Sequence, residues 1–171
     1  MKKLFAAFLL SMAAFSAQAV VVNSNINPNG VDYTYFNLDA DSLVHLETLY
    51  GQFDPYMYLF RDDGSLDAAD YIAQNDDGGT PALSFYNSLL NINLTAGNYV
   101  VVVGDFYLSI DEAINGYADN SFLSGGYSLL MTANNGNITV TNGVPVPEPT
   151  TLGLLGLGLL GFGFARRKNR Q

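Results

Sequence analysis

Between Val20 and Pro145 the chain has no long segment in which apolar residues recur with the period of a helix. Short alternating apolar runs are instead separated by glycine, asparagine and aspartate, a pattern typical of an all-β domain. Seven or eight short strands at this spacing predict a β-sandwich of the jelly-roll type. The predicted strands are Val31–Leu38, Ser42–Thr48, Tyr56–Phe60, Tyr71–Gln74, Phe85–Leu94, Tyr99–Val103, Tyr127–Thr132 and Ile138–Thr141.

Four consecutive valines, residues 100–103, stand out among these strands. A strand that is apolar on both faces belongs near the centre of a sheet. The following stretch, Asp105 to Ser124, is acidic and has weak helix potential near Ile110–Ile114. A loop of this length is unusual in a compact domain and is often functional.

The charges are distributed very unevenly along the chain. Between Val20 and Ala165 the single basic residue Arg61 stands against all 16 acidic residues, a formal charge near −15. Such a domain repels nucleic acid and anionic lipid and is stabilised by bound cations. The chain has no cysteine, so disulfides are excluded, and an exported domain of this kind depends on its core or on metal. The other basic residues lie at the two ends: Lys2, Lys3, Arg166, Arg167, Lys168 and Arg170.

The N-terminus has the three parts of a signal peptide. Lys2 and Lys3 form a positive region, Leu4 to Phe15 an apolar region, and Ala17-Gln18-Ala19 an A-x-A cleavage site. We therefore expect export and cleavage after Ala19. The alternative, an uncleaved anchor helix, would require a longer apolar run.

The C-terminus also has three parts: a proline-rich spacer from Val144, an apolar run Leu152–Ala165, and a basic cluster of Arg166, Arg167 and Lys168. Basic residues after an apolar run stay on the cytoplasmic side of a membrane. A helix over the 14 residues of the run would be about 21 Å long, shorter than the roughly 30 Å hydrocarbon core. The pattern predicts a marginal, transient transmembrane anchor; a buried core helix is the alternative.

These three parts, with Pro147, Glu148 and Pro149 as the signature, resemble the PEP-CTERM sorting segment of exported Gram-negative proteins, also called the ice-binding protein C-terminal domain. The second name implies no ice binding. The resemblance implies recognition by the membrane protease exosortase and an inner-membrane-anchored intermediate. It further implies a final place at the cell surface or outside the cell, in association with exopolysaccharide.

Acidic residues gather around one predicted hairpin. If Tyr56–Phe60 pairs with Tyr71–Gln74 so that Phe60 faces Tyr71, Asp54 falls opposite Asp77. Facing carboxylates destabilise a sheet unless a cation lies between them. Hard oxygen ligands without cysteine or histidine clusters favour Ca²⁺. The predicted ligands are Asp54, Asn75, Asp76, Asp77 and Asp105.

Simpler interpretations remain open for these residues. Asp62-Asp63-Gly64 has the composition of a turn and does not match an EF-hand loop. The run from Asn75 to Gly79 is also compatible with a turn alone. Asp105 either joins the site or only ends the valine strand.

The segment from Val31 to Ala133 resembles the pre-peptidase C-terminal domain, a β-sandwich of secreted bacterial proteins. The matching pieces are Phe53-Asp54-Pro55, Tyr58-Leu59-Phe60, Asp63-Gly64, Asn75-Asp76-Asp77-Gly78-Gly79 and Leu94-Thr95-Ala96-Gly97-Asn98-Tyr99-Val100. The resemblance implies a jelly-roll-like accessory domain that often binds Ca²⁺ and has no catalysis of its own. The expected organisation is a signal peptide (1–19), a sandwich (20–133), a polar linker (134–146) and a sorting and anchor segment (147–171).

We therefore expect a non-enzymatic exported protein at the cell surface or in the extracellular matrix. One alternative is a carbohydrate-binding module that uses some of the 11 tyrosines as stacking platforms, although packing in a half-buried sheet explains them as well. A second is a small polysaccharide-degrading enzyme that uses paired acids. The single histidine, His45, lies in an apolar strand without a recognisable catalytic triad.

Overall fold

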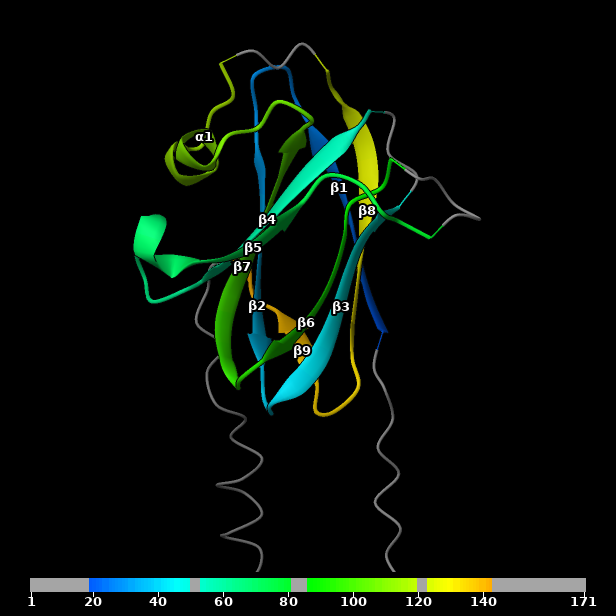
Figure 1. Ribbon diagram of the computed structural model, residues 1–171, viewed down its shortest axis with the longest axis vertical. Helices are drawn as coiled ribbons and strands as arrows, with labels where there is room; N and C mark the ends of the chain where they lie inside the picture. The colour runs from blue at the N-terminus through cyan, green and yellow to red at the C-terminus, as the bar shows by residue number, and fades with distance from the viewer. Residues whose placement is uncertain (1–18, 50–52, 81–85, 120–122, 143–171) are drawn as a thin grey trace, which may run out of the picture.

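The computed structural model describes residues 19–49, 53–80, 86–119 and 123–142, which form two facing antiparallel sheets (Figure 1). One sheet has the order β1 (Ala19–Ile26), β8 (Gly125–Ala133), β3 (Ser42–Leu49) and β6 (Leu89–Leu94). The other has the order β5 (Tyr71–Asn75), β4 (Pro55–Arg61), β7 (Gly97–Asp105), β2 (Asp32–Leu38) and β9 (Ile138–Val140). The prediction of an all-β two-sheet sandwich is confirmed.

Successive strands alternate between the two sheets along most of the chain. The orders β1-β8-β3-β6 and β2-β7-β4-β5 together are the strand order of a jelly roll, and β9 extends the second sheet beside β2. The sandwich therefore continues past residue 133, into the segment that the sequence predicts to be a linker. The central strand β7 runs from one end of the sandwich to the other, and we name these two ends by its residues. We call the end at Asp105 and Pro55 the upper end and the end at Gly97 and Ser42 the lower end (Figure 1).

The main core lies between the sheets. Its largest fully buried members come from both sheets and include Phe36, Leu46, Leu59, Tyr99 and Leu129. Phe36 and Tyr99 stack with their ring centroids 5.4 Å apart, on neighbouring strands β2 and β7. Aromatic and aliphatic side chains that alternate along paired strands are what holds such a sandwich together.

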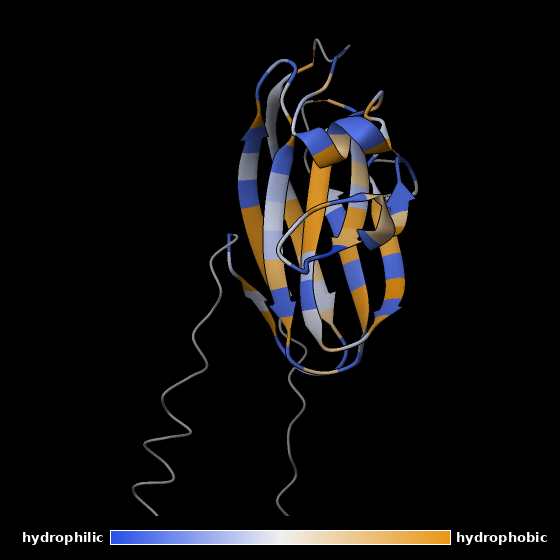
Figure 2. Ribbon diagram, turned by 90° about the vertical axis from the view of Figure 1, so that its left-hand side faces the viewer, coloured by the Kyte–Doolittle hydropathy of each residue, from blue (hydrophilic) through white to orange (hydrophobic). Residues whose placement is uncertain are grey.

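The outer face of the five-stranded sheet carries a second apolar layer. β7 is the middle strand of this sheet, and all four of its valines are buried, as predicted for a strand that is apolar on both faces. Val100 and Val102 pack beneath the short helix α1 (Ile110–Asn115), together with Tyr58 and Phe60. Figure 2 views this side and shows the helix lying over hydrophobic strand segments.

Hydrogen bonds hold α1 in this position. Ser109 caps its N-terminus in a reciprocal capping box with Glu112, and Gly116 ends it with a φ of 83°. From the sheet, the Tyr33 hydroxyl donates to the carbonyl of Ala113 at 2.7 Å. Several tyrosines of this face are thus packing residues rather than an open platform.

The largest differences between the predicted and the observed strands lie at β1 and β6. The sequence predicts no strand before residue 31, but β1 pairs with β8 over its whole length, from Ala19 opposite Thr132 to Ile26 opposite Gly125. The predicted strand Phe85–Leu94 is shorter in the structure, where β6 begins at Leu89; residue 85 lies outside the described residues.

The connection between β4 and β5 begins with a turn and includes the 3-10 helix η1 (Ala68–Asp70). Asp62 Oδ1 accepts a hydrogen bond from Gly64 N at 3.1 Å, and Asp63 Oδ1 accepts one from Ser65 N at 3.1 Å. Gly64 has a φ of 103°, which glycine adopts without steric cost. Asp62-Asp63-Gly64 is therefore a turn, the interpretation that the sequence favours.

Candidate cation site

Four segments meet at the upper end around Pro55. Pro55, the first residue of β4, pairs with Asp105, the last residue of β7, and Asp54 directly precedes it. The hydroxyl of Ser88 donates to the carbonyl of Pro55 at 2.5 Å and lies 3.4 Å from the carbonyl of Asp76. The fold thus brings Asp54, Asp105 and the segments after β5 and before β6 to one corner.

Three buried polar atoms near this corner have no hydrogen-bond partner: Asp54 Oδ1, Asp105 Oδ2 and Asn87 Nδ2. Asp105 is 1% exposed and Asn87 is 3% exposed. A buried carboxylate oxygen without a donor is costly, and a bound cation removes that cost. Rotation of the Asn87 amide would place its oxygen where the unpartnered nitrogen lies. The arrangement is what a cation site needs: buried oxygens that the protein itself leaves unsatisfied.

The acidic residues of the corner repel each other. Burial raises the pKa of Asp54 above its ordinary value, and the nearby carboxylates of Asp77 and Asp76 raise it further. Asp76 is half-buried and Asp77 is exposed. Protonation or a cation would relieve this repulsion equally well.

The predicted hairpin register is correct at one end and shifted at the other. Phe60 faces Tyr71, as expected, but an irregularity between Leu59 and Phe60 moves the rest of the pairing by one residue, so that Met57 faces Asn75. Continuing this register places Asp54 opposite Gly78 instead of Asp77. The physical cause is a β-bulge, which inserts an extra residue into β5.

The predicted ligands consequently have different roles in the structure. Asn75 Oδ1 accepts a hydrogen bond from Leu89 N at 2.9 Å, so this oxygen already fastens β5 to β6. Asp105 ends its strand: Oδ1 accepts from Tyr107 N at 3.1 Å, and its carbonyl accepts from Leu108 N at 2.9 Å. Its second carboxylate oxygen remains unpartnered.

Within the described ranges, no three acidic, histidine or cysteine side chains lie close enough together to share one metal ion. An ion at this corner would therefore be held by fewer carboxylates, with neutral oxygens completing the shell. Ca²⁺ accepts such mixed sets, because it takes six to eight oxygens in flexible geometry, including amide and backbone carbonyls. Asn87 is the additional candidate that sequence reasoning missed. It lies within a predicted strand, so nothing in its local pattern marks it as a ligand.

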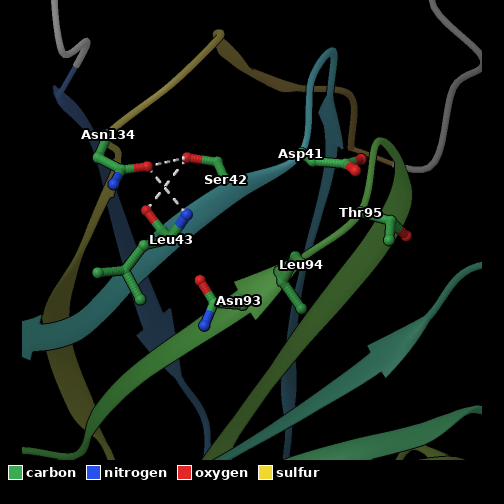
Figure 3. Close-up of a pocket in the computed structure, with 7 residues that line it drawn as sticks. All are labelled: Asp41, Ser42, Leu43, Asn93, Leu94, Thr95 and Asn134. Carbon is green, nitrogen blue, oxygen red and sulfur yellow. Dashed lines mark hydrogen bonds between the residues drawn. The ribbon is translucent and has the colours of Figure 1, made fainter.

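A separate open pocket of about 320 Å³ lies at the lower end, lined by Asp41, Ser42, Leu43, Asn93, Leu94, Thr95 and Asn134 (Figure 3). Asn134 Oδ1 accepts hydrogen bonds from Ser42 Oγ at 2.8 Å and from Leu43 N at 2.9 Å. These internal bonds already engage Ser42 Oγ and Asn134 Oδ1, two of the polar atoms that line the pocket. The pocket is a structural corner at the opposite end of β7 from the candidate cation site.

His45 has partners on both ring nitrogens. Nδ1 lies 2.9 Å from Asn91 Oδ1, and Nε2 lies 3.2 Å from Glu47 Oε2. Glu47 is 2% exposed and is also bonded by the Thr80 hydroxyl at 3.1 Å. With both nitrogens engaged, His45 has none free to serve as a general base.

The predicted processing residues lie largely outside the described residues. This applies to Ala17, the motif Pro147–Pro149, the apolar run 152–165 and the cluster Arg166, Arg167 and Lys168; Ala19 is described and is the first residue of β1. No helix in the part of the chain that the structure describes is both long and apolar enough to cross a bilayer.

Comparison with known proteins identifies the C-terminal segment. Residues 145–168 match the PEP-CTERM protein-sorting motif. The motif implies export, a membrane-anchored sorting signal and recognition by exosortase. No curated protein matches the chain.

The fold is similar to three solved structures. The pre-peptidase C-terminal domain of collagenase from Bacillus anthracis is 18% identical with a TM-score of 0.45, covering 66% of this chain and 87% of that one. PliG from Aeromonas hydrophila, a periplasmic lysozyme inhibitor of g-type lysozyme, is 13% identical with a TM-score of 0.42, covering 68% and 87%. The Yersinia pseudotuberculosis-derived mitogen is 15% identical with a TM-score of 0.43, covering 68% and 86%.

Proposed function

We propose that this protein is a non-enzymatic component of the cell surface or extracellular matrix of a Gram-negative bacterium. It is exported through a signal peptide cleaved after Ala19, held transiently in the inner membrane by its C-terminal segment, and sorted by exosortase. Its role is structural, in association with exopolysaccharide. Ca²⁺ stabilises the sandwich through Asp54 and Asp105, with Asp76, Asp77 and neutral oxygens nearby.

The proposal rests mainly on the position of the sorting motif, which begins after the last strand of the sandwich. The last strand, β9, ends at Val140, and the Thr141 N–H donates to the Tyr35 carbonyl at 2.8 Å. The motif begins at residue 145. Cleavage within it therefore removes no strand, and the sandwich can be released or attached intact.

A variant of the signature tripeptide tests the sorting step. Glu148→Ala should leave membrane insertion intact but block maturation, because partition into lipid depends on the apolar run and recognition on the tripeptide. Val144→Ala, just outside the matched residues, is the matched control and should mature normally. Equal processing of the two variants in the host would count against exosortase sorting.

A truncation before Leu152 tests the independence of the fold. The shortened chain should leave the membrane fraction and melt at the same temperature as the full chain, since no strand is lost. Retention in the membrane fraction would show that the sandwich itself binds there.

A carbohydrate-binding role is the second candidate, and one observation favours it. Phe106 and Tyr107, directly after Asp105, are 44% and 68% exposed, with their ring centroids 5.1 Å apart. Exposed aromatic rings of this kind offer a stacking surface for sugars. Tyr107→Ala should then reduce binding to the exopolysaccharide of the host without lowering the melting temperature. Unchanged binding would leave these rings without a role in carbohydrate recognition.

A further inference from the structure

The strand β1 forms one outer edge of the four-stranded sheet. All eight of its residues pair with β8 without a bulge, and the structure pairs no other described strand with its second side. β1 contains no charged residue and no proline. An edge of this kind presents unpaired backbone N–H and C=O groups that can pair with another strand.

Two of the other three edges of the sandwich are protected, and the edge at β6 is engaged at its upper end. At β6, Leu89 N donates to the Asn75 side chain, and the preceding Ser88 bridges to Gly78. β5 carries the bulge opposite Leu59 and is flanked by Asp70 and Asp76. β9 has only three residues. Charges, bulges and short length are the devices by which proteins prevent edge-to-edge pairing, and β1 has none of them.

The charge distribution singles out the same sheet. Between Val20 and Asn142 there are 15 acidic residues, and the strands of the four-stranded sheet carry a single one, Glu47, which is 2% exposed. Two copies of so acidic a domain repel each other unless they meet over neutral surface. β1 offers such a surface, and its outward Val21 is 54% exposed.

From these observations we infer that the protein self-associates through β1, which pairs antiparallel with β1 of a second copy. The two four-stranded sheets then join into one continuous sheet across a two-fold axis. A second copy is the fitting partner because the side chains of the edge are uncharged, and because the described strands of this sheet expose no aromatic ring on which a sugar could stack. The inference is independent of the proposed cation site and of sorting.

The two-fold axis restricts the pairing further. It runs perpendicular to the joined sheet, so outward side chains of one β1 lie opposite outward side chains of the other. The outward residues with exposed side chains are Val21, Asn23 and Asn25. A charge introduced among them in both copies places two like charges on the same side of the joined pair of strands and opposes the pairing.

Sedimentation equilibrium of the exported chain at fixed ionic strength tests the inference. The protein should form dimers, and Val21→Glu should weaken dimerisation by roughly tenfold or more, because it adds two like charges to the same side of the paired strands in place of apolar surface. Tyr107→Glu is the matched control: it adds the same charge at a residue that is 68% exposed at the upper end, and it should leave dimerisation unchanged. Unchanged melting temperatures would show that both variants fold.

A third variant separates edge pairing from packing of one sheet face on another. Leu43→Glu places the charge on the inner strand β3 of the same sheet, at a residue that is 43% exposed. Edge pairing predicts little effect. A loss of dimer equal to that of Val21→Glu would move the interface to the sheet face and overturn the inference, as would a parent protein that stays monomeric at all concentrations.

Discussion

Pro55 faces Asp105 across β4 and β7, at the point where both strands reach the upper end. Proline has no N–H to donate, so Pro55 gives Asp105 no backbone hydrogen bond across this pairing. Asp54 Oδ1 and Asp105 Oδ2 are both buried and unpartnered. The local sequence Asp54-Pro55 thus creates an acidic corner that the protein does not neutralise by itself.

Ca²⁺ should stabilise the sandwich through this corner. The free energy of unfolding should rise by about 2.7 kcal/mol when free Ca²⁺ is a hundredfold above its dissociation constant. Mg²⁺ should raise it less, because Mg²⁺ demands octahedral geometry. Thermal melts at fixed ionic strength measure the difference. Asp54→Asn and Asp105→Asn should abolish the Ca²⁺-specific gain, whereas Asp63→Asn, in the exposed turn, should keep it. Identical melting temperatures in Ca²⁺, Mg²⁺ and matched NaCl would contradict the site.

In the absence of metal, Asp105→Asn should stabilise the protein. A neutral amide costs less to bury than an unpartnered carboxylate, so the expected gain is on the order of 1–3 kcal/mol. The oxygen that accepts from Tyr107 N is retained in the variant. Urea unfolding in the presence of a chelator measures the change. A less stable variant would show that the carboxylate has a partner in solution.

The raised pKa of Asp54 makes the metal-free stability depend on pH. Its folded-state pKa lies above the ordinary 3.8, so the folded protein binds more protons than the unfolded chain in the interval between the two values. This contribution to stability is therefore present at low pH and is lost as pH rises through the folded-state pKa. The difference between the parent and Asp54→Asn, measured by unfolding from pH 3 upward, should show that slope. A pH-independent difference would contradict the raised pKa of Asp54.

Glu47 should show the reverse dependence. Burial alone would raise its pKa, but hydrogen bonds from Thr80 and His45 outweigh burial and lower it below 4.5. The stability that these bonds provide is present above pH 4.5 and is lost as pH falls through the lowered pKa. Glu47→Gln should cost about 1–3 kcal/mol at neutral pH and lose this acid dependence. Equal acid unfolding curves for the two proteins would be the contrary result.

Tyr33 links the helix to the sheet through its hydroxyl, and removing this hydroxyl should loosen α1. Tyr33→Phe deletes the hydrogen bond to the Ala113 carbonyl, at a cost of about 1 kcal/mol. Burial, and to a lesser extent Tyr35, raise the pKa of Tyr33 from 10.0 to about 12. Its contribution is accordingly complete below pH 10 and is lost as pH rises toward 12. Hydrogen exchange of the α1 amides measures the loosening; equal protection in both proteins would contradict the link.

The pattern of the sequence was sufficient to predict the two-sheet class and the central valine strand, and it indicated weak helix potential where α1 lies, but not the capping of that helix. β1 escaped prediction because Asn23, Ser24 and Asn25 are residues typical of loops. They form a strand because β8, more than 100 positions away, supplies the pairing partner. Long-range pairing of this kind leaves no local signal.

The candidate site was predictable in composition but not in geometry. Asp54 and Asp105 carry unpartnered oxygens, as expected of ligands, whereas Asn75 is bonded to Leu89. The bulge beside Leu59 shifted the register that would have placed Asp77 opposite Asp54. Asn87 approaches the corner because Ser88 is bonded to Pro55, a tertiary contact that strand periodicity does not encode.

The intact mass of the mature protein, purified from its host, shows whether the chain is exported and sorted as proposed. We expect a chain that begins at Val20 and ends upstream of Leu152, with the apolar run and the basic cluster removed. A surface or extracellular protein that still begins at Met1, or that retains residues 152–171 unprocessed, would contradict this expectation.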